Sequence, residues 1–120
     1  MMIAAPRSSE TTMMIVPQFR SFGGAIGRSV ARARVEPGRT TRWHRLDAIT
    51  ERYVILEGRG RAEVDGLARD VQPGDVVIIA PGLPQRITNT GDEDLVFLAV
   101  CTPRFEPSAY SEIPELENTE

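Results

Sequence analysis

The chain has 120 residues, of which 26% are charged, and a net charge of −3, which is the composition of one small globular domain. The negative charge argues against nucleic-acid binding, since neutralising phosphates needs a cationic surface. All the basic residues are arginine, which excludes lysine Schiff-base chemistry and a P-loop for nucleotides. No run reaches the about 18 apolar residues of a membrane span. One cysteine and one histidine exclude an internal disulfide and a multi-histidine metal site within one chain.

The N-terminal residues predict an arm followed by two strands. Residues 1–12 are polar and aperiodic, so we expect a flexible N-terminal arm. Residues 13–19 predict a short edge strand that Pro17 weakens. Residues 29–35 alternate between small apolar side chains and arginines, which is the period of a half-buried strand.

The remainder of the chain predicts further short strands separated by turns with Gly or Pro. The predicted strands are residues 51–57, 60–64, 67–71, 75–80, 85–90 and 95–101. The last of these is the most apolar and should be the most buried, and Asp65-Gly66 predicts a hairpin turn. No amphipathic segment of helix length intervenes, so the pattern indicates an all-β sandwich or small barrel over residues 13–102. Residues 103–120 contain three prolines and five glutamates, and we expect an extended C-terminal strap with a solvated acidic end.

Two stretches of this sequence share a regular spacing of glycines and polar residues. The first reads Gly38, five residues, His44, one residue, Leu46, four residues, Glu51, six residues, Gly58. The second reads Gly74, five residues, Ala80, one residue, Gly82, two residues, Gln85, three residues, Asn89. In order, spacing and separation they resemble the two motifs of the cupin superfamily, and the resemblance covers residues 30–102.

The resemblance implies a double-stranded β-helix, also called a jelly-roll barrel. It further implies a pocket in which two His and one Glu of the first motif and one His of the second bind a divalent metal. Leu46 and Gln85 stand where the motifs have His, and Ala80 stands where the second has Pro. The implied ligand set is therefore reduced to His44, Glu51 and Gln85, and zinc, nickel, manganese and iron are not distinguished. The two-His-one-carboxylate iron site of oxygenases cannot be assembled from these residues.

Strand periodicity gives the same grouping of side chains. His44 and Leu46 are two residues apart and share a face, as do Glu51 and Tyr53 on the next strand. If the strands lie as in cupins, these side chains and Gln85 converge inside the barrel. Tyr53, Leu46 and Gln85 are then ligand-binding candidates, although Tyr53 is equally well explained by packing of the barrel. His44 and Glu51 are the candidate catalytic residues.

Three functions are compatible with these residues, and the sequence does not decide whether the protein is an enzyme. The first is a metal-dependent enzyme of the isomerase or lyase type acting on a small molecule. The second is a non-catalytic module that binds or senses a small molecule. The third is a metal-free acid–base enzyme using a His44–Glu51 pair, whose plain structural counterpart is a core histidine hydrogen-bonded to that carboxylate.

Residues beside the motif positions have other expected roles. Arg42 and Arg86 should point away from the site toward solvent or a subunit interface, and Trp43 toward an interface or under the N-terminal arm. Arg32 and Arg34 share a face, which should be a solvated sheet face; if that face lines the pocket, they could meet an anionic ligand. Cys101 should be an inert buried thiol. We expect a cytoplasmic homodimer with a small-molecule ligand and no nucleotide, nucleic-acid or membrane partner.

Overall fold

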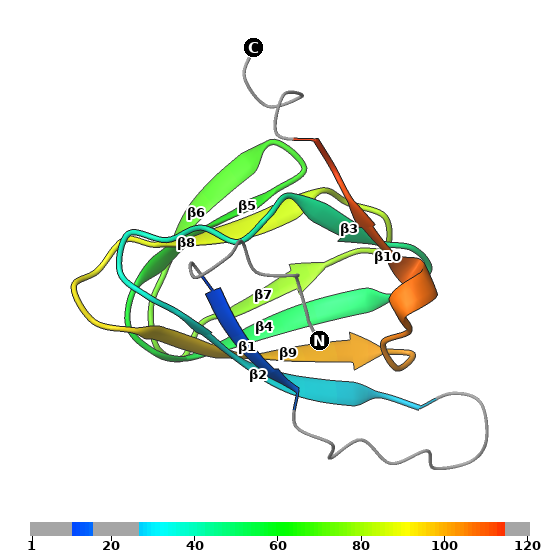
Figure 1. Cartoon of the computed structure of the whole chain (residues 1–120), viewed down its shortest axis with the longest axis horizontal. Helices are drawn as coiled ribbons and strands as arrows, with labels where there is room; N and C mark the ends of the chain where they lie inside the picture. The colour runs from blue at the N-terminus through cyan, green and yellow to red at the C-terminus, as the bar shows by residue number, and fades with distance from the viewer. Residues whose placement is uncertain (1–10, 16–26, 115–120) are drawn as a thin grey trace.

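Two five-stranded antiparallel sheets face each other in the computed structural model, which describes residues 11–15 and 27–114 (Figure 1). Sheet A has the order β1-β2-β9-β4-β7 and sheet B the order β10-β3-β8-β5-β6. The strands are β1 Thr11–Ile15, β2 Ser29–Val35, β3 His44–Leu46, β4 Thr50–Glu57, β5 Gly60–Val64, β6 Leu67–Val71, β7 Val76–Ile79, β8 Gln85–Asn89, β9 Leu95–Thr102 and β10 Tyr110–Glu112. The predicted all-β class is confirmed, and the arrangement is a double-stranded β-helix.

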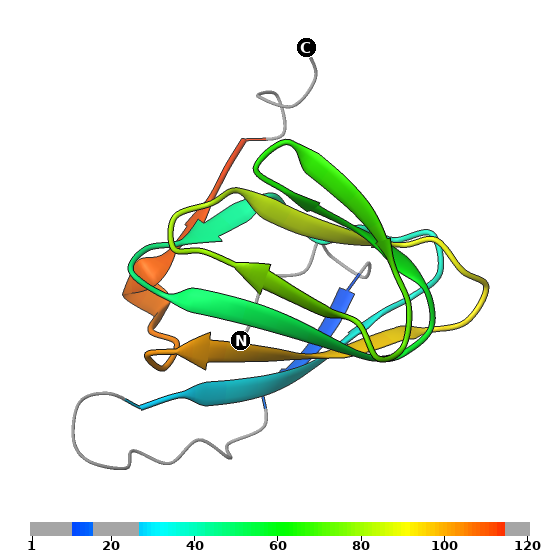
Figure 2. The same cartoon turned by 180° about the vertical axis from the view of Figure 1, so that it is seen from behind.

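Local sequence explains most of these strands. The alternation in β2 places Ala31, Ala33 and Val35 in the interior and leaves the intervening arginines half-buried. Asp65 and Gly66 both have positive φ, as the tight turn of the β5–β6 hairpin requires. Figure 2 shows this hairpin at the end of sheet B, beside the strand β8 with which β5 pairs.

The hydrophobic core fills the space between the two sheets. Sheet A contributes Phe97, Ile55 and Leu95, and sheet B contributes Ile87 and Leu46. Strand β9 alternates between fully buried and half-buried residues after three buried residues at its start, so the prediction that it is the most buried strand is confirmed. The core thus holds the inner faces of both sheets at a fixed separation, and polar side chains on those faces are enclosed with it.

Both ends of the described chain differ from the sequence expectation. Thr11 and Thr12, placed in the flexible arm, belong to β1 because they pair with β2 residues opposite. The predicted strand over 13–19 ends at Ile15, and Pro17 and residues 1–10 lie outside the described residues. The strap is not extended throughout. Residues 107–109 form a 3₁₀ turn, and Tyr110–Glu112 pair with β3 to complete sheet B, while residues 115–120 lie outside the described part.

Within residues 11–15 and 27–114, no helix has the length and apolar character needed to cross a membrane.

Candidate functional site

The side chains predicted from the two motifs lie in the interior, between the inner faces of the sheets. His44, Glu51 and Gln85 have exposed fractions of 0%, 0% and 1%. His44 on β3 is the direct register partner of Gln85 on β8, so the two belong to neighbouring positions of sheet B. Glu51 and Tyr53 project from β4 of sheet A, and the Tyr53 hydroxyl donates a hydrogen bond across the barrel to Gln85 Oε1. The structure therefore encloses an imidazole, a carboxyl, an amide and a phenol in one interior.

The imidazole of His44 is held in one tautomer. Its Nδ1 lies 2.9 Å from the carbonyl oxygen of Arg42, and a carbonyl can only accept, so Nδ1 carries the proton. Nε2 then bears an unprotonated lone pair, and this buried atom has no hydrogen-bond partner among the described residues. Burial lowers the pKa of His44 from 6.5 to about 4, because the imidazolium would lose its hydration. The side chain is a neutral base whose one free lone pair is in the interior.

The carboxyl of Glu51 is also buried. Neither Oε1 nor Oε2 has a partner with hydrogen-bond geometry among the described residues, although the side chain of Gln85 lies close enough to act on the carboxyl. Burial raises the pKa of Glu51 from 4.5 to about 8, since the carboxylate is not solvated there, and the Gln85 side chain opposes part of this rise. The predicted hydrogen-bonded His44–Glu51 pair is not formed, because the atoms that would make it have no partner. A structural pair of this kind is therefore excluded as the reason that the two residues are buried.

Burial also raises the pKa values of two neighbouring groups in the interior, Tyr53 and Cys101. Burial, and then the nearby charge of Glu51, raises the pKa of Tyr53 well above 10. Cys101 is the register partner of Glu51 on β9, and burial raises the pKa of its thiol to about 11. The thiol is thus protonated at neutral pH, in agreement with its expected inert role.

The free atoms suit a divalent cation better than they suit an empty core. Buried polar groups in folded proteins are normally paired, and the three unpaired atoms on these two side chains are of the kinds that ligate divalent cations, unlike the unpaired Nε of Arg42 and Nε1 of Trp43. A histidine whose Nδ1 is bound to a carbonyl is the arrangement that orients Nε2 toward a metal. Among the described residues no three His, Cys, Asp or Glu side chains are grouped as ligands, so a third protein ligand would have to be the amide oxygen of Gln85. Leu46, buried beside His44, adds no donor.

One aromatic contact at this site was missed in the sequence. Tyr110 of β10 stacks on His44 with ring centroids 5.3 Å apart and planes at 19°. The register of β10 with β3 places Tyr110 opposite Leu46, next to the imidazole. No local pattern marks this contact, since it depends on the pairing of a three-residue strand with a segment more than 60 positions earlier in the chain.

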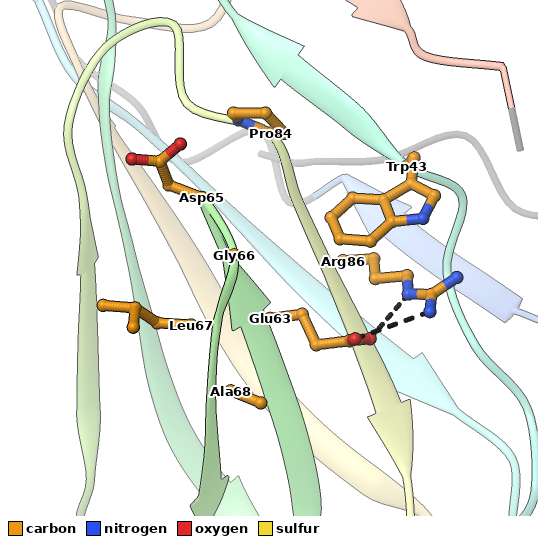
Figure 3. A pocket seen from close by; sticks show the side chains of 8 residues that line it. All are labelled: Trp43, Glu63, Asp65, Gly66, Leu67, Ala68, Pro84 and Arg86. Carbon is orange, nitrogen blue, oxygen red and sulfur yellow. Dashed lines mark hydrogen bonds and ion pairs between the residues drawn. The ribbon is translucent and has the colours of Figure 1, made fainter. Parts of the chain in front are cut away.

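Residues on the outer face of sheet B make a separate pocket. As expected, Trp43 and Arg86 point away from the interior, and Figure 3 shows them beside Glu63 on β5. The Arg86 guanidinium lies 4.4 Å above the Trp43 ring, and its Nε is 2.6 Å from Glu63 Oε1. One face of the Trp43 ring is thus covered by an arginine of its own chain, and residues 1–10 of the predicted arm lie outside the described residues. The pocket of about 280 Å³ lined by these residues contains none of the predicted site residues.

The remaining arginines singled out in the sequence lie at the surface. Arg42 pairs with Glu112 at 3.2 Å, and Arg34 pairs with Asp94 at 2.8 Å. Arg32 is half-buried, at the same outer face as Arg34. None of these pairs involves the interior side chains, so the arginines shape the surface around the barrel.

Sequence comparison finds one family model and two relatives that are similar to this chain. The family model described as a cupin domain matches residues 31–101. An uncharacterised protein of Methanocaldococcus jannaschii is 35% identical, with the match covering 67% of this chain and 64% of that protein, so the chain spans slightly less than two thirds of it. An oxalate-binding protein of Thermotoga maritima is 37% identical, with 78% of this chain and 89% of that protein covered.

Solved structures show the same fold. A double-stranded β-helix protein from Klebsiella pneumoniae superposes with a TM-score of 0.73 at 18% identity, covering 92% of this chain and 90% of that one. A predicted oxalate decarboxylase from Thermotoga maritima superposes with a TM-score of 0.60 at 27% identity, covering 82% of this chain and 98% of that one.

Proposed function

Because the chain belongs to the cupin family, we propose that it binds a small carboxylate-bearing molecule at a divalent cation held inside the barrel by His44, Glu51 and Gln85. The observation that carries the proposal is the set of buried, unpartnered ligand atoms, Nε2 of His44 and both carboxyl oxygens of Glu51. A bound divalent ion would supply Lewis acidity toward a carboxylate. The protein's own residues supply the donors and the shape of the surrounding wall.

Each proposed ligand has a supporting contact. The Arg42 carbonyl fixes the His44 tautomer, and the Tyr53 hydroxyl holds the amide of Gln85 while leaving a second lone pair on Oε1. Glu51 is neutral at pH 7 while unpaired, since its pKa is raised to about 8 by burial, and would give up its proton on binding a cation. The donor set of one imidazole and two oxygens is weaker than a set with three imidazoles, so binding depends strongly on His44.

One relative and the wall of the site support the proposed ligand class. The relative from Thermotoga maritima is called an oxalate-binding protein, which favours a small carboxylate as the ligand here. The side chains of Leu46 and Phe97 make the surroundings apolar and favour a compact molecule. The ring centroid of Phe97 lies 4.7 Å from that of Tyr53. Lyase- or isomerase-type catalysis at the same residues is the alternative within this proposal. A metal-free reaction by a joined His44–Glu51 pair has no support in the geometry.

Calorimetry with chelator-treated protein tests the proposal. Zinc, nickel, manganese and iron(II) are titrated separately, and oxalate is then added to the protein with and without the best ion. We expect one equivalent of cation and oxalate binding only in its presence. His44→Gln should abolish both, whereas Arg45→Gln, an exposed change at the next residue, should preserve them. Uptake below about a tenth of an equivalent for all four ions would refute the cation site.

A homodimer is proposed on separate grounds. Strand β7 is an edge of sheet A, and its outward residues Val76 and Ile78 are 52% and 66% exposed. An apolar edge strand is protected when a second chain covers it. Light scattering should give twice the chain mass, and Ile78→Glu should shift the protein toward monomer; a monomer for the wild type would refute the proposal. We also propose a cytoplasmic location, where the single buried thiol of Cys101 stays reduced.

A further inference from the structure

One short segment lies against the only histidine of the chain. Residues 107–112, here called the closing segment, comprise a 3₁₀ turn and β10 at the edge of sheet B. From this segment Tyr110 stacks on His44 and is itself half-buried, whereas His44 is fully buried. One face of the imidazole is therefore separated from the surface by a single aromatic ring.

The closing segment is joined to His44 through Arg42. The backbone carbonyl of Arg42 accepts a hydrogen bond from Nδ1 of His44. The guanidinium of the same arginine pairs with the Glu112 carboxylate at 3.2 Å. Glu112 is in turn the register partner of His44, and the Ile113 amide donates to the Trp43 carbonyl. The residue that fixes the imidazole thus also anchors the segment that covers it.

The closing segment is attached at the edge of sheet B by few contacts. Its 3₁₀ turn has no fully buried residue, Ala109 and Tyr110 pack against the core from outside, the Ala109 carbonyl accepts a hydrogen bond from the Asp47 amide, and β10 pairs with β3 over three positions. The Arg42–Glu112 pair is about 40% exposed on both sides, so it contributes little to stability. Edge elements with few buried contacts open locally at a lower free-energy cost than global unfolding.

We propose that Tyr110 controls access of small molecules to His44, and that the closing segment opens and closes over the site with the Arg42–Glu112 pair as its latch. The ring acts by covering and orienting the imidazole and supplies no group to a reaction. The proposal deepens the function proposed above by naming the way into the same site. It concerns the protein without a cation, so its test has an outcome independent of cation binding.

Chemical modification of His44 measures this access directly. Diethyl pyrocarbonate acylates accessible imidazole nitrogen, and the single histidine makes the reaction specific when it is followed by peptide mass mapping of chelator-treated protein. We expect wild type to react much more slowly than N-acetylhistidine. Tyr110→Ala should react about tenfold faster than wild type, and Tyr110→Phe, which keeps the ring, within about twofold of it.

Two further variants separate gating from loss of fold. Ser111→Ala changes the same strand without touching the ring contact or the latch, and should keep the wild-type rate. Glu112→Gln weakens the latch and the 3.4 Å hydrogen bond that Glu112 accepts from the Tyr110 hydroxyl but keeps the Tyr110 ring, and should raise the rate by about twofold to threefold with an unchanged urea midpoint. The proposal is overturned if wild type reacts like N-acetylhistidine. It is equally overturned if folded Tyr110→Ala reacts at the wild-type rate or, should that variant not fold, if Glu112→Gln reacts at the wild-type rate.

Discussion

The buried carboxyl of Glu51 makes the stability of the cation-free protein depend on pH in a way that one substitution should remove. Its pKa is about 8 in the folded protein and 4.5 as the ordinary value. Below pH 4.5 both the folded and the unfolded chain hold the proton, so this group's favourable contribution is fully present. Between pH 4.5 and 8 only the unfolded chain releases it, so the stability of the wild type falls by about 1.4 kcal/mol per pH unit.

Glu51→Gln retains a similar shape but cannot ionise. From pH 5 to pH 8, the free energy of unfolding of the variant should therefore rise by about 3–4 kcal/mol relative to wild type, because the slope flattens close to each pKa. His44 titrates with the opposite sign. Its pKa is lowered to about 4, so its stabilising contribution is present above pH 6.5 and lost as the pH falls toward 4. Both proteins contain His44, so this contribution cancels in the difference.

Urea denaturation followed by the fluorescence of Trp43, the single tryptophan, gives the required free energies at each pH. Chelator must be present throughout, because a bound cation would stabilise the ionised carboxylate and hide the effect. Glu57→Gln, an exposed change on the same strand, is the matched control for the loss of one carboxylate. Free energies of Glu51→Gln and wild type that stay parallel within about 1 kcal/mol from pH 5 to pH 8 would show that Glu51 is not an unpaired buried group.

Three further predictions concern the ligand set and the packing. Leu46→His adds a second interior imidazole and should raise zinc affinity at least about tenfold in calorimetry, whereas Leu46→Met should not. Gly60→Ala should lower the free energy of unfolding by about 1–3 kcal/mol, because the added Cβ would lie 2.7 Å from the Thr88 carbonyl oxygen. Gly91→Ala, with its closest contact at 3.6 Å, should change it by less than about 0.5 kcal/mol, and equal effects of the two would contradict the packing. Phe97→Ala should cost about 3–5 kcal/mol in the same urea assay, because the ring is fully buried in the core, and a cost below about 1 kcal/mol would contradict this.

Much of the candidate site was predictable, since Glu51 and Gln85 lie in predicted strands, whereas His44 was placed by the motif spacing because β3 is not among the strands that the local pattern predicts. His44, Glu51 and Gln85 occupy fixed positions in two spaced motifs, and the period of two in a strand places alternate side chains on one face. Their burial on the inner faces agrees with that prediction. The missing hydrogen bond between His44 and Glu51 was not predictable, because spacing along the chain fixes the face of a side chain but not its distance from a neighbour on the opposing sheet.

The sequence by itself determined the strands with strong alternation or tight turns, such as β2 and the β5–β6 hairpin, because those signals come from neighbouring residues. Only the tertiary structure decided the fate of residues 107–112, whose short strand exists because β3 offers it a backbone partner. The same non-local pairing brings Tyr110 onto His44 and Glu112 to Arg42. A three-residue strand has too few residues for a detectable period, so its position and its contacts follow from the assembled barrel.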